Sequence, residues 1–218
     1  ELAKEKIFAQ AWHFVGDHSL VAEKNSAYPF TIQHEPLLLT RDSENNLHCL
    51  SNVCTHRGAI LVEKPCTLYD IRCRYHGRRF KTDGTFQSMP EFTEVENFPA
   101  ESDNLPSLNL FQWGPMVFTH FSKTISPEPF FSAMMQRMAW LPIGEFKFRP
   151  DLSNDYEVNA HWGLYCENYL EGFHIPFVHP GLNQEVDYGN YTTELYEYSN
   201  LQLGIAKKGK PCFDLPES

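Results

Sequence analysis

The chain has 218 residues, of which 42% are hydrophobic, and a formal net charge of −10 at pH 7. This length can bury the core of one large or two modest domains. The acidic balance argues against nucleic acid as a partner. No apolar run is long enough to span a bilayer, and residues 1–6 are too charged for a secretory signal, so we expect a cytoplasmic protein with no membrane partner.

The first quarter of the chain predicts a short helix followed by β structure. Apolar residues recur at helical spacing over residues 2–14, which predicts a helix that ends near Gly16. Residues 28–32 and 36–40 read as short strands, and 47–53 as a third strand after a polar turn. The loop that follows residue 53 therefore extends from a β-hairpin.

That loop and a second one each carry a cysteine, a histidine and a glycine at short spacing. Two thiolates and two imidazoles could hold either one tetrahedral zinc or a [2Fe–2S] cluster in which two His replace two Cys on one iron. Structural zinc usually takes each half-site from a pair of cysteines, whereas here each half supplies one thiolate and one imidazole, which favours the cluster. The six residues are Cys54, His56, Gly58, Cys73, His76 and Gly77.

The other cysteines show no spacing typical of a disulfide framework, which agrees with a reducing compartment. They are Cys49, Cys66, Cys166 and Cys212.

More strands are predicted after the first loop. Residues 66–72 read as a strand that delivers the second loop, and 80–86 as a hairpin around Asp83-Gly84. Residues 108–121 return to strand, with Gly114-Pro115 as an interruption. We therefore predict one antiparallel β domain over residues 12–122.

Beyond residue 123 the pattern becomes mixed. Residues 127–141 carry apolar side chains at helical spacing after Ser126, a candidate N-cap. Residues 146–149 and 155–158 read as a pair of strands, and residues 161–174 as a helix.

A second candidate metal site lies at the end of that last helix. Glu171 and His174 would share one face of the helix, and a break before Pro176 would let His179 fold back to the same point. Two imidazoles and one carboxylate form a facial triad that leaves positions open on Fe(II). Considered alone, two such histidines are more often structural than metal ligands.

Taken together, the two stretches resemble the Rieske non-haem iron oxygenases, in particular the catalytic alpha subunits of ring-hydroxylating dioxygenases and of choline monooxygenase-like enzymes. The resemblance rests on the Cys-x-His and Cys-x-x-His loops, the Gly114 region, and the run from Asn168 to Pro180. It implies an α+β fold in which residues 12–122 form a Rieske [2Fe–2S] domain. Residues 1–11 and 123–218 would form the N-terminal part of a helix-grip catalytic domain that is incomplete in this chain.

The same resemblance implies roles for individual residues. Cys54, His56, Cys73 and His76 would hold the cluster, and His174 and His179 would ligate the catalytic iron. Glu171 would bridge cluster and iron, and Asn168 would lie near the iron.

Two departures from the family pattern stand out. Arg78 follows the second loop where a Trp is common in the family, which could alter the hydrogen bonding and the docking surface of the cluster. The third iron ligand of the family, an acidic residue, would lie beyond Ser218. The carboxylates within reach in the sequence, Glu185, Asp187 and Asp214, do not occupy the family's position.

The resemblance further implies a terminal oxygenase component that activates O2 and hydroxylates or demethylates a small substrate. Electrons would come from NAD(P)H through a separate reductase, with or without a ferredoxin, since nothing in this chain resembles a nicotinamide site. The substrate could be an aromatic ring, as in aromatic hydrocarbon catabolism, or a quaternary amine. Glu instead of Asp at position 171 tilts the choice towards the amine branch. The rival hypothesis is an electron carrier without oxygenase activity.

Charge along the chain suggests how copies assemble. Residues 57–81 contain seven basic and two acidic residues, whereas residues 151–218 contain eleven acidic and three basic ones. In a homotrimer, these regions could be two halves of one head-to-tail interface, with Glu171 between His174 of its own chain and His76 of the neighbour. The alternative is two solvated surfaces that differ in sign.

Overall fold

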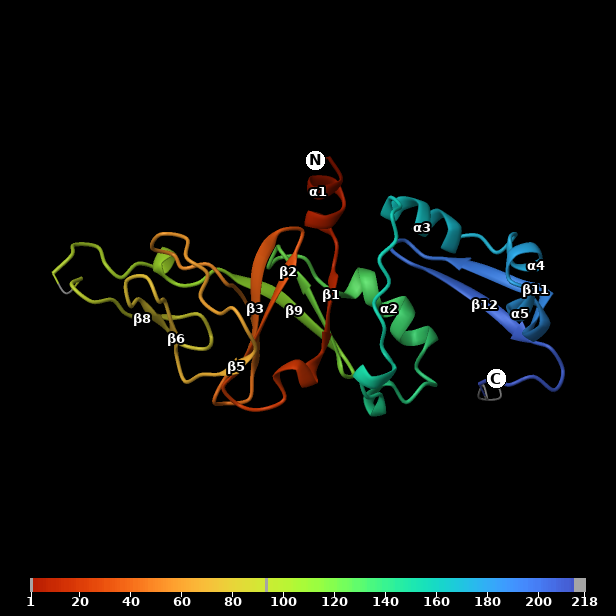
Figure 1. Cartoon of the computed structure of the whole chain (residues 1–218), viewed down its shortest axis with the longest axis horizontal. Helices are drawn as coiled ribbons and strands as arrows, with labels where there is room; N and C mark the ends of the chain where they lie inside the picture. The colour runs from red at the N-terminus through yellow and green to blue at the C-terminus, as the bar shows by residue number, and fades with distance from the viewer. Residues whose placement is uncertain (1, 93, 214–218) are drawn as a thin grey trace. The chain divides into compact units, whose positions relative to one another are not determined.

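The structure, a computed structural model, describes residues 2–92 and 94–213 (Figure 1). The chain divides into two compact units. The β unit contains residues 1–127 and 142–148, and the mixed unit contains residues 128–141 and 149–218. None of the described helices has the length and apolar character needed to cross a bilayer.

The β unit is built on an antiparallel seven-stranded sheet of order β1-β10-β9-β4-β3-β2-β5, with a three-stranded sheet of order β6-β7-β8. Three of its six neighbouring pairs, β2-β3, β3-β4 and β9-β10, are hairpins of consecutive strands, and the other three join strands that are distant in sequence. Its strands are β1 (His13–Asp17), β2 (Ser26–Ile32), β3 (Glu35–Arg41), β4 (Leu47–Ser51), β5 (Cys66–Thr67), β9 (Ser107–Trp113) and β10 (Met116–His120). The smaller sheet contains β6 (Ile71–Arg72), β7 (Arg79–Phe80) and β8 (Phe86–Ser88).

This unit also contains short helices. They are α1 (Leu2–Lys6) and the 3-10 turns Phe8–Gln10, His18–Val21, Glu101–Asp103 and Ile143–Glu145.

The hairpins predicted around the loops are confirmed. β3 pairs with β4 from Leu37↔Ser51 to Arg41↔Leu47, and the polar turn between them lies at residues 42–46. β9 and β10 turn at Gly114, whose φ is +58° and whose added Cβ would lie 2.8 Å from Cγ2 of Ile143. Only glycine accepts both the backbone conformation and this approach.

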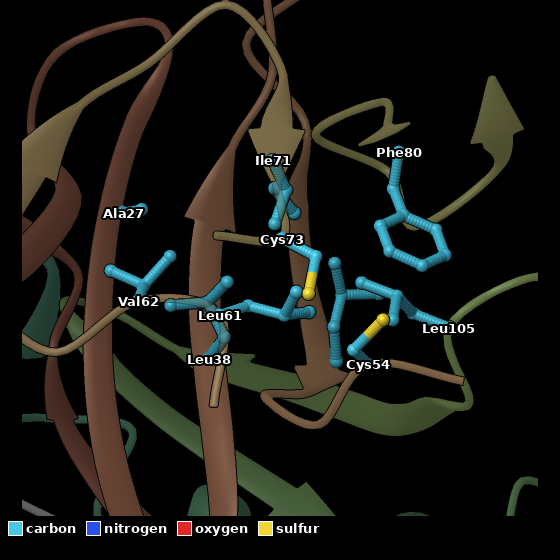
Figure 2. Close-up of a cluster of buried hydrophobic side chains, with 10 residues drawn as sticks. Ala27, Leu38, Cys54, Leu61, Val62, Ile71, Cys73, Phe80 and Leu105 are labelled. Carbon is cyan, nitrogen blue, oxygen red and sulfur yellow. The ribbon is translucent and has the colours of Figure 1, made fainter. Parts of the chain in front are cut away.

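The main core of the β unit surrounds the two cysteines of the candidate cluster site. Figure 2 shows Cys54 and Cys73 among large apolar side chains, with both sulfur atoms inside the cluster. Leu38, Ile71 and Phe80 are completely buried there. The thiols are therefore held by the packing of the domain and not by the flexible surface.

The mixed unit contains α2 (Glu128–Arg137), α3 (Trp162–Tyr169), α4 (Ile175–Val178) and α5 (Pro180–Glu185), and the 3-10 turn Pro150–Leu152. Its strands are β11 (Val186–Leu195) and β12 (Asn200–Ala206), an antiparallel ribbon. Phe130 stacks on Tyr198 at 4.2 Å between ring centroids, and Arg137 pairs with Glu194 at 2.8 Å. These contacts attach α2 to the ribbon.

Two predicted elements near the N-terminus and before the second loop are wrong in extent. The helix expected over residues 2–14 ends at Lys6, because His13–Asp17 pairs with β10, where Phe14 lies opposite Phe118. The strand expected over residues 66–72 is two strands, because Cys66 pairs with β2 and Ile71 pairs with β7. In both places partner strands decide the conformation.

The strand pair expected at residues 146–149 and 155–158 is absent from the described structure. Pro150, which lacks a backbone N–H, begins a 3-10 turn there, and Nε of Arg149 lies 2.8 Å from Oδ1 of Asp151. Residues 146–148 and residues 149 onward also belong to different units, so the two segments do not form one hairpin.

The helix expected over residues 161–174 ends at Tyr169. Oε2 of Glu171 accepts a hydrogen bond from the N–H of Phe173, so this N–H does not continue the helical pattern. The carbonyl of Tyr169, which the N–H of Phe173 would otherwise reach, accepts from Nε2 of Gln202 instead. A side chain that captures a backbone donor competes with helix continuation.

Candidate metal centres

The two cysteine-containing loops share one backbone pattern. The carbonyl of Cys54 accepts from the N–H of Gly58, and the carbonyl of Cys73 from that of Gly77, each at 3.0 Å. The N–H groups of both cysteines donate to the residue five positions later, each at 2.8 Å. Gly58 and Gly77 have φ of +72° and +73°, which explains why glycine ends both loops.

These loops bring the four candidate ligands together as two pairs. Cys54 and Cys73 are 3% and 2% exposed, and their thiols interact with each other. The rings of His56 and His76 lie 4.7 Å apart between centroids, at 75°. His56 is half-buried, whereas His76 is exposed. A buried sulfur pair and an outer imidazole pair match a centre with two sulfur-ligated and two nitrogen-ligated positions.

The state of His56 provides a test of whether a metal fits. Its Nδ1 is buried and has no hydrogen-bond partner. A buried polar nitrogen without a partner is costly, and a metal ion bound at this atom would satisfy it. The residues present therefore fit the cluster. Across the described residues, no three His, Cys, Asp or Glu side chains converge as ligands of a single ion would.

The surroundings of the Cys54 thiol disfavour its ionised form when no metal is bound. Burial raises the pKa of Cys54, and the neighbouring thiol of Cys73 raises it further. The N–H groups of His56 and Arg57 donate to the Cys54 sulfur and oppose this shift. Since a thiolate ligand must be deprotonated, binding of metal would release protons and add to folding stability.

Arg78 is buried directly after the second loop, and its burial was not predicted from the sequence. Its guanidinium pairs with Asp103 and lies over the rings of Phe80, Phe86 and Phe98. Asp103 was missed by the sequence analysis altogether, because a single acidic residue in an irregular segment has no distinguishing pattern. Arg78 is therefore not part of the surface charge of the loops.

The second candidate site lies between α3 and α5. His174 is the residue before α4, and His179 is the residue between α4 and α5. Their rings are 5.1 Å apart between centroids, at 71°. Glu171 pairs with Nδ1 of His174 through Oε1, and this contact lowers the pKa of Glu171. Glu171 and His179 thus each lie beside His174, and a turn, not the continuous helix that the sequence predicted, brings them there.

An open cavity of about 490 Å³ adjoins Glu171. Gly172 at its wall approaches Tyr191 of β11 so closely that an added Cβ would lie 2.8 Å from Cε1 of the tyrosine. The aromatic residues that line the cavity are Phe173, Tyr188 and Tyr191.

The remaining candidates are dispersed. Asn168 is exposed in the last turn of α3. Glu185 pairs with Lys210 at 3.0 Å, and Asp187 accepts from Gly189 and Asn190. Asp214 lies outside the described residues.

Ion pairs in the two regions leave most of the difference in net charge in place, because most of these pairs join opposite charges within one region. The basic loops and the acidic unit both contain internal ion pairs. These pairs are Arg74–Glu63, Arg79–Asp70, Arg78–Asp103, Arg137–Glu194 and Lys210–Glu185.

Comparison with known families defines first the class of each region. Residues 11–99 match the Rieske [2Fe-2S] domain, and residues 110–204 match the ring hydroxylating alpha subunit (catalytic domain). Both domains imply iron cofactors. The chain belongs to the alpha subunits of the Rieske non-haem iron oxygenases, a family of oxidoreductases.

Individual relatives extend this comparison. The chain is 27% identical to the choline monooxygenase, chloroplastic, of Beta vulgaris, over 95% of this chain and 48% of that protein. It is 27% identical to the carnitine monooxygenase oxygenase subunit of Acinetobacter pittii, over all of this chain and 59% of that protein. The chain thus spans about half the length of the curated relatives that it matches.

Solved structures of Rieske oxygenases are similar to this chain as well. The quaternary ammonium Rieske monooxygenase CntA in complex with L-carnitine superposes with a TM-score of 0.78 at 26% identity, over 93% of this chain and 58% of that chain. Naphthalene 1,2-dioxygenase from Rhodococcus sp. superposes with a TM-score of 0.69 at 18% identity, over 96% of this chain and 51% of that chain, and so shares the fold.

Proposed function

We propose that this chain is the part of a terminal oxygenase that holds a Rieske [2Fe–2S] cluster and two ligands of a mononuclear iron. The observation that supports the proposal is that one chain contains both sets of candidate ligands. Cys54 and His56 of the first loop face their counterparts of the second, and His174 and His179 form a separate imidazole pair. Carrier activity alone would not require the second pair.

When bound, the cluster supplies single electrons and the mononuclear iron supplies O2 activation. The chain's own residues orient the ligands. Because Oε1 of Glu171 bonds Nδ1 of His174, the proton of that ring is held on Nδ1 and Nε2 is left available for a metal. The third ligand, which the facial triad requires, is proposed to come from sequence beyond Ser218.

We propose that the substrate is a small quaternary amine, in preference to an aromatic ring. Choline and carnitine monooxygenases are among the relatives, and Glu171 gives the cavity a carboxylate. Three aromatic residues line the same cavity, and aromatic faces attract a quaternary ammonium group. An aromatic ring could stack on the same side chains, which is the second candidate.

We further propose a homotrimer in which electrons pass between subunits, supplied by a reductase with or without a ferredoxin. The structure of the related quaternary ammonium Rieske monooxygenase is described in terms of inter-subunit electron transfer. In this chain His76 is exposed, and the Glu171 side chain is 35% exposed, so both can be reached by another subunit. All six cysteines are free, which supports a reducing compartment such as the cytoplasm.

A His174→Ala variant of the full-length protein tests the oxygenase proposal. The parent protein should be brown, bind about three irons per chain, and consume O2 with choline, carnitine or an aromatic substrate. The variant should bind about two irons, keep the Rieske EPR signal and lose substrate oxidation. A parent protein with two irons and no O2 consumption would instead be an electron carrier.

His161→Ala is the matched control. His161 belongs to the same unit, where Nδ1 accepts from the N–H of Gly163 at 3.1 Å at the start of α3. This variant should keep the iron content of the parent. Loss of the cluster signal in His174→Ala would show that His174 is needed for folding and is not an iron ligand.

A further inference from the structure

Arg78 is a buried cation beside the second ligand loop. Its side chain is 3% exposed, against 19% for its partner Asp103. The guanidinium carbon lies 5.8, 5.0 and 5.6 Å from the ring centroids of Phe80, Phe86 and Phe98. A charge in such surroundings persists only where it is paired, and an aromatic cage adds a favourable cation–π contribution.

The Arg78–Asp103 pair also connects the two ligand loops. The carbonyl of Arg78 accepts the N–H of Cys73 at 2.8 Å. On the other side, the carbonyl of Asp103 accepts the hydroxyl of Thr55, the residue between Cys54 and His56, at 2.9 Å. The ion pair therefore spans the space between a residue of the first loop and the base of the second.

The positive charge of Arg78 is not fully balanced at this place. Nε of Arg78 is buried without a hydrogen-bond partner, while the Asp103 carboxylate is the more exposed member of the pair and also accepts from the N–H of Ala100.

We propose that Arg78 is a positioning residue that clamps the two loops and, through its buried charge, raises the reduction potential of the cluster. Reduction adds one negative charge to the centre, so a nearby buried cation stabilises the reduced form more than the oxidised form. The inference rests on the proposed cluster.

Redox titration of the purified full-length protein, followed by EPR and voltammetry, tests this role. Arg78→Met removes the charge and keeps the length of the side chain, so the midpoint potential should fall. We expect at least a tenfold loss in the equilibrium constant for reduction, which is 59 mV for one electron. Asp103→Asn, which removes the opposing charge, should shift the potential in the positive direction.

Arg79→Met is the matched control. Arg79 is the next residue, its side chain is 45% exposed, and it pairs with Asp70, so water screens its charge. Its loss should change the potential much less than the loss of Arg78. Equal potentials in Arg78→Met and the parent protein would overturn the proposal, as would an equal shift in both Arg variants.

Arg78→Lys separates charge from fold. If Arg78→Met does not retain iron, Arg78→Lys should retain it with a potential close to that of the parent. Loss of iron from both variants would overturn the electrostatic role. A parent protein with no cluster would refute the proposed function itself, an outcome distinct from all of these.

Discussion

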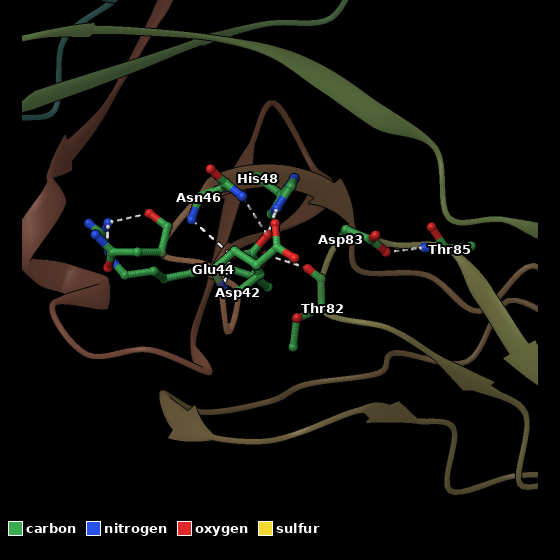
Figure 3. Close-up of polar contacts among 10 residues, drawn as sticks. Asp42, Glu44, Asn46, His48, Thr82, Asp83 and Thr85 are labelled. Atoms are coloured by element: carbon green, nitrogen blue, oxygen red, sulfur yellow. Dashed lines mark hydrogen bonds and ion pairs between the residues drawn. The ribbon is translucent and has the colours of Figure 1, made fainter.

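The turn between β3 and β4 contains a carboxylate whose ionisation should contribute measurably to stability. The Asp42 side chain is 14% exposed, and Nε2 of His48 lies 2.8 Å from its Oδ2 (Figure 3). Its Oδ1 accepts from the N–H of Asn46 at 2.8 Å and of Glu44 at 2.9 Å. Burial by itself would raise the pKa of Asp42, but these hydrogen bonds outweigh it and hold the pKa at about 2, against 3.8 ordinarily.

This shift sets both the size and the sign of the effect. A depressed carboxyl pKa stabilises the folded state above the unfolded pKa, and the stabilisation is lost as the pH falls from 3.8 through about 2. At about 1.4 kcal/mol per unit, it corresponds to about 2 kcal/mol at neutral pH and to roughly half of that at pH 3.

The variant Asp42→Asn tests this contribution of the Asp42 carboxylate to stability. Urea unfolding, followed by tryptophan fluorescence, should show a loss of about 2 kcal/mol at pH 7, and the gap to the parent should shrink by half at pH 3. Both proteins are compared at the same pH, so acid release of the cluster affects both. Equal stability at pH 7, or a gap that does not change with pH, would refute the reasoning.

Asp83→Asn is the control, because Asp83 makes a similar turn contact at the surface. Its Oδ1 accepts from the N–H of Thr85 at 2.8 Å, and the residue is exposed (Figure 3). We expect its free energy of unfolding to change by a few tenths of a kcal/mol at either pH.

The Asp42 turn matters for the site because the adjacent residue Thr40 donates a hydrogen bond to the carbonyl of Thr82 at 2.7 Å. This bond links the first hairpin to the one after the second loop.

Two further substitutions test other features. Glu171→Gln should keep both metals but slow substrate oxidation, since the amide cannot hold the charge beside His174; undiminished steady-state turnover would contradict the bridging role. Gly84→Ala should cost roughly 1–3 kcal/mol in urea unfolding, because φ is +88° and the new Cβ would lie 2.8 Å from Cδ2 of Leu50. Gly209→Ala, with φ of +82° and no atom within 4 Å, should cost only the backbone part; equal losses would exclude the clash.

The sequence by itself determined the features that depend on local spacing. The turn at Asp83-Gly84 and the strand interruption at Gly114-Pro115 need particular backbone conformations, and glycine or a turn-forming residue at those positions reveals them. The ligand pairs were also recognisable, because a metal requires specific side chains at short separations.

Features that depend on distant partners were decided only by the tertiary structure. Residues 13–17 form a strand because β10 offers an edge, although their apolar spacing suits a helix. The helix before His174 ends early because Gln202, from β12, takes the carbonyl of Tyr169.

Arg78 shows the same limit for the site. In the sequence it is one of several basic residues after the second loop, and its burial depends on Asp103 and on three phenylalanines brought from β7, β8 and the segment beyond. A charged side chain is buried only when the fold supplies its counter-charge and its apolar surroundings together. Since Asp103 and Phe98 lie far along the chain from Arg78, local pattern could not separate this arginine from its exposed neighbours.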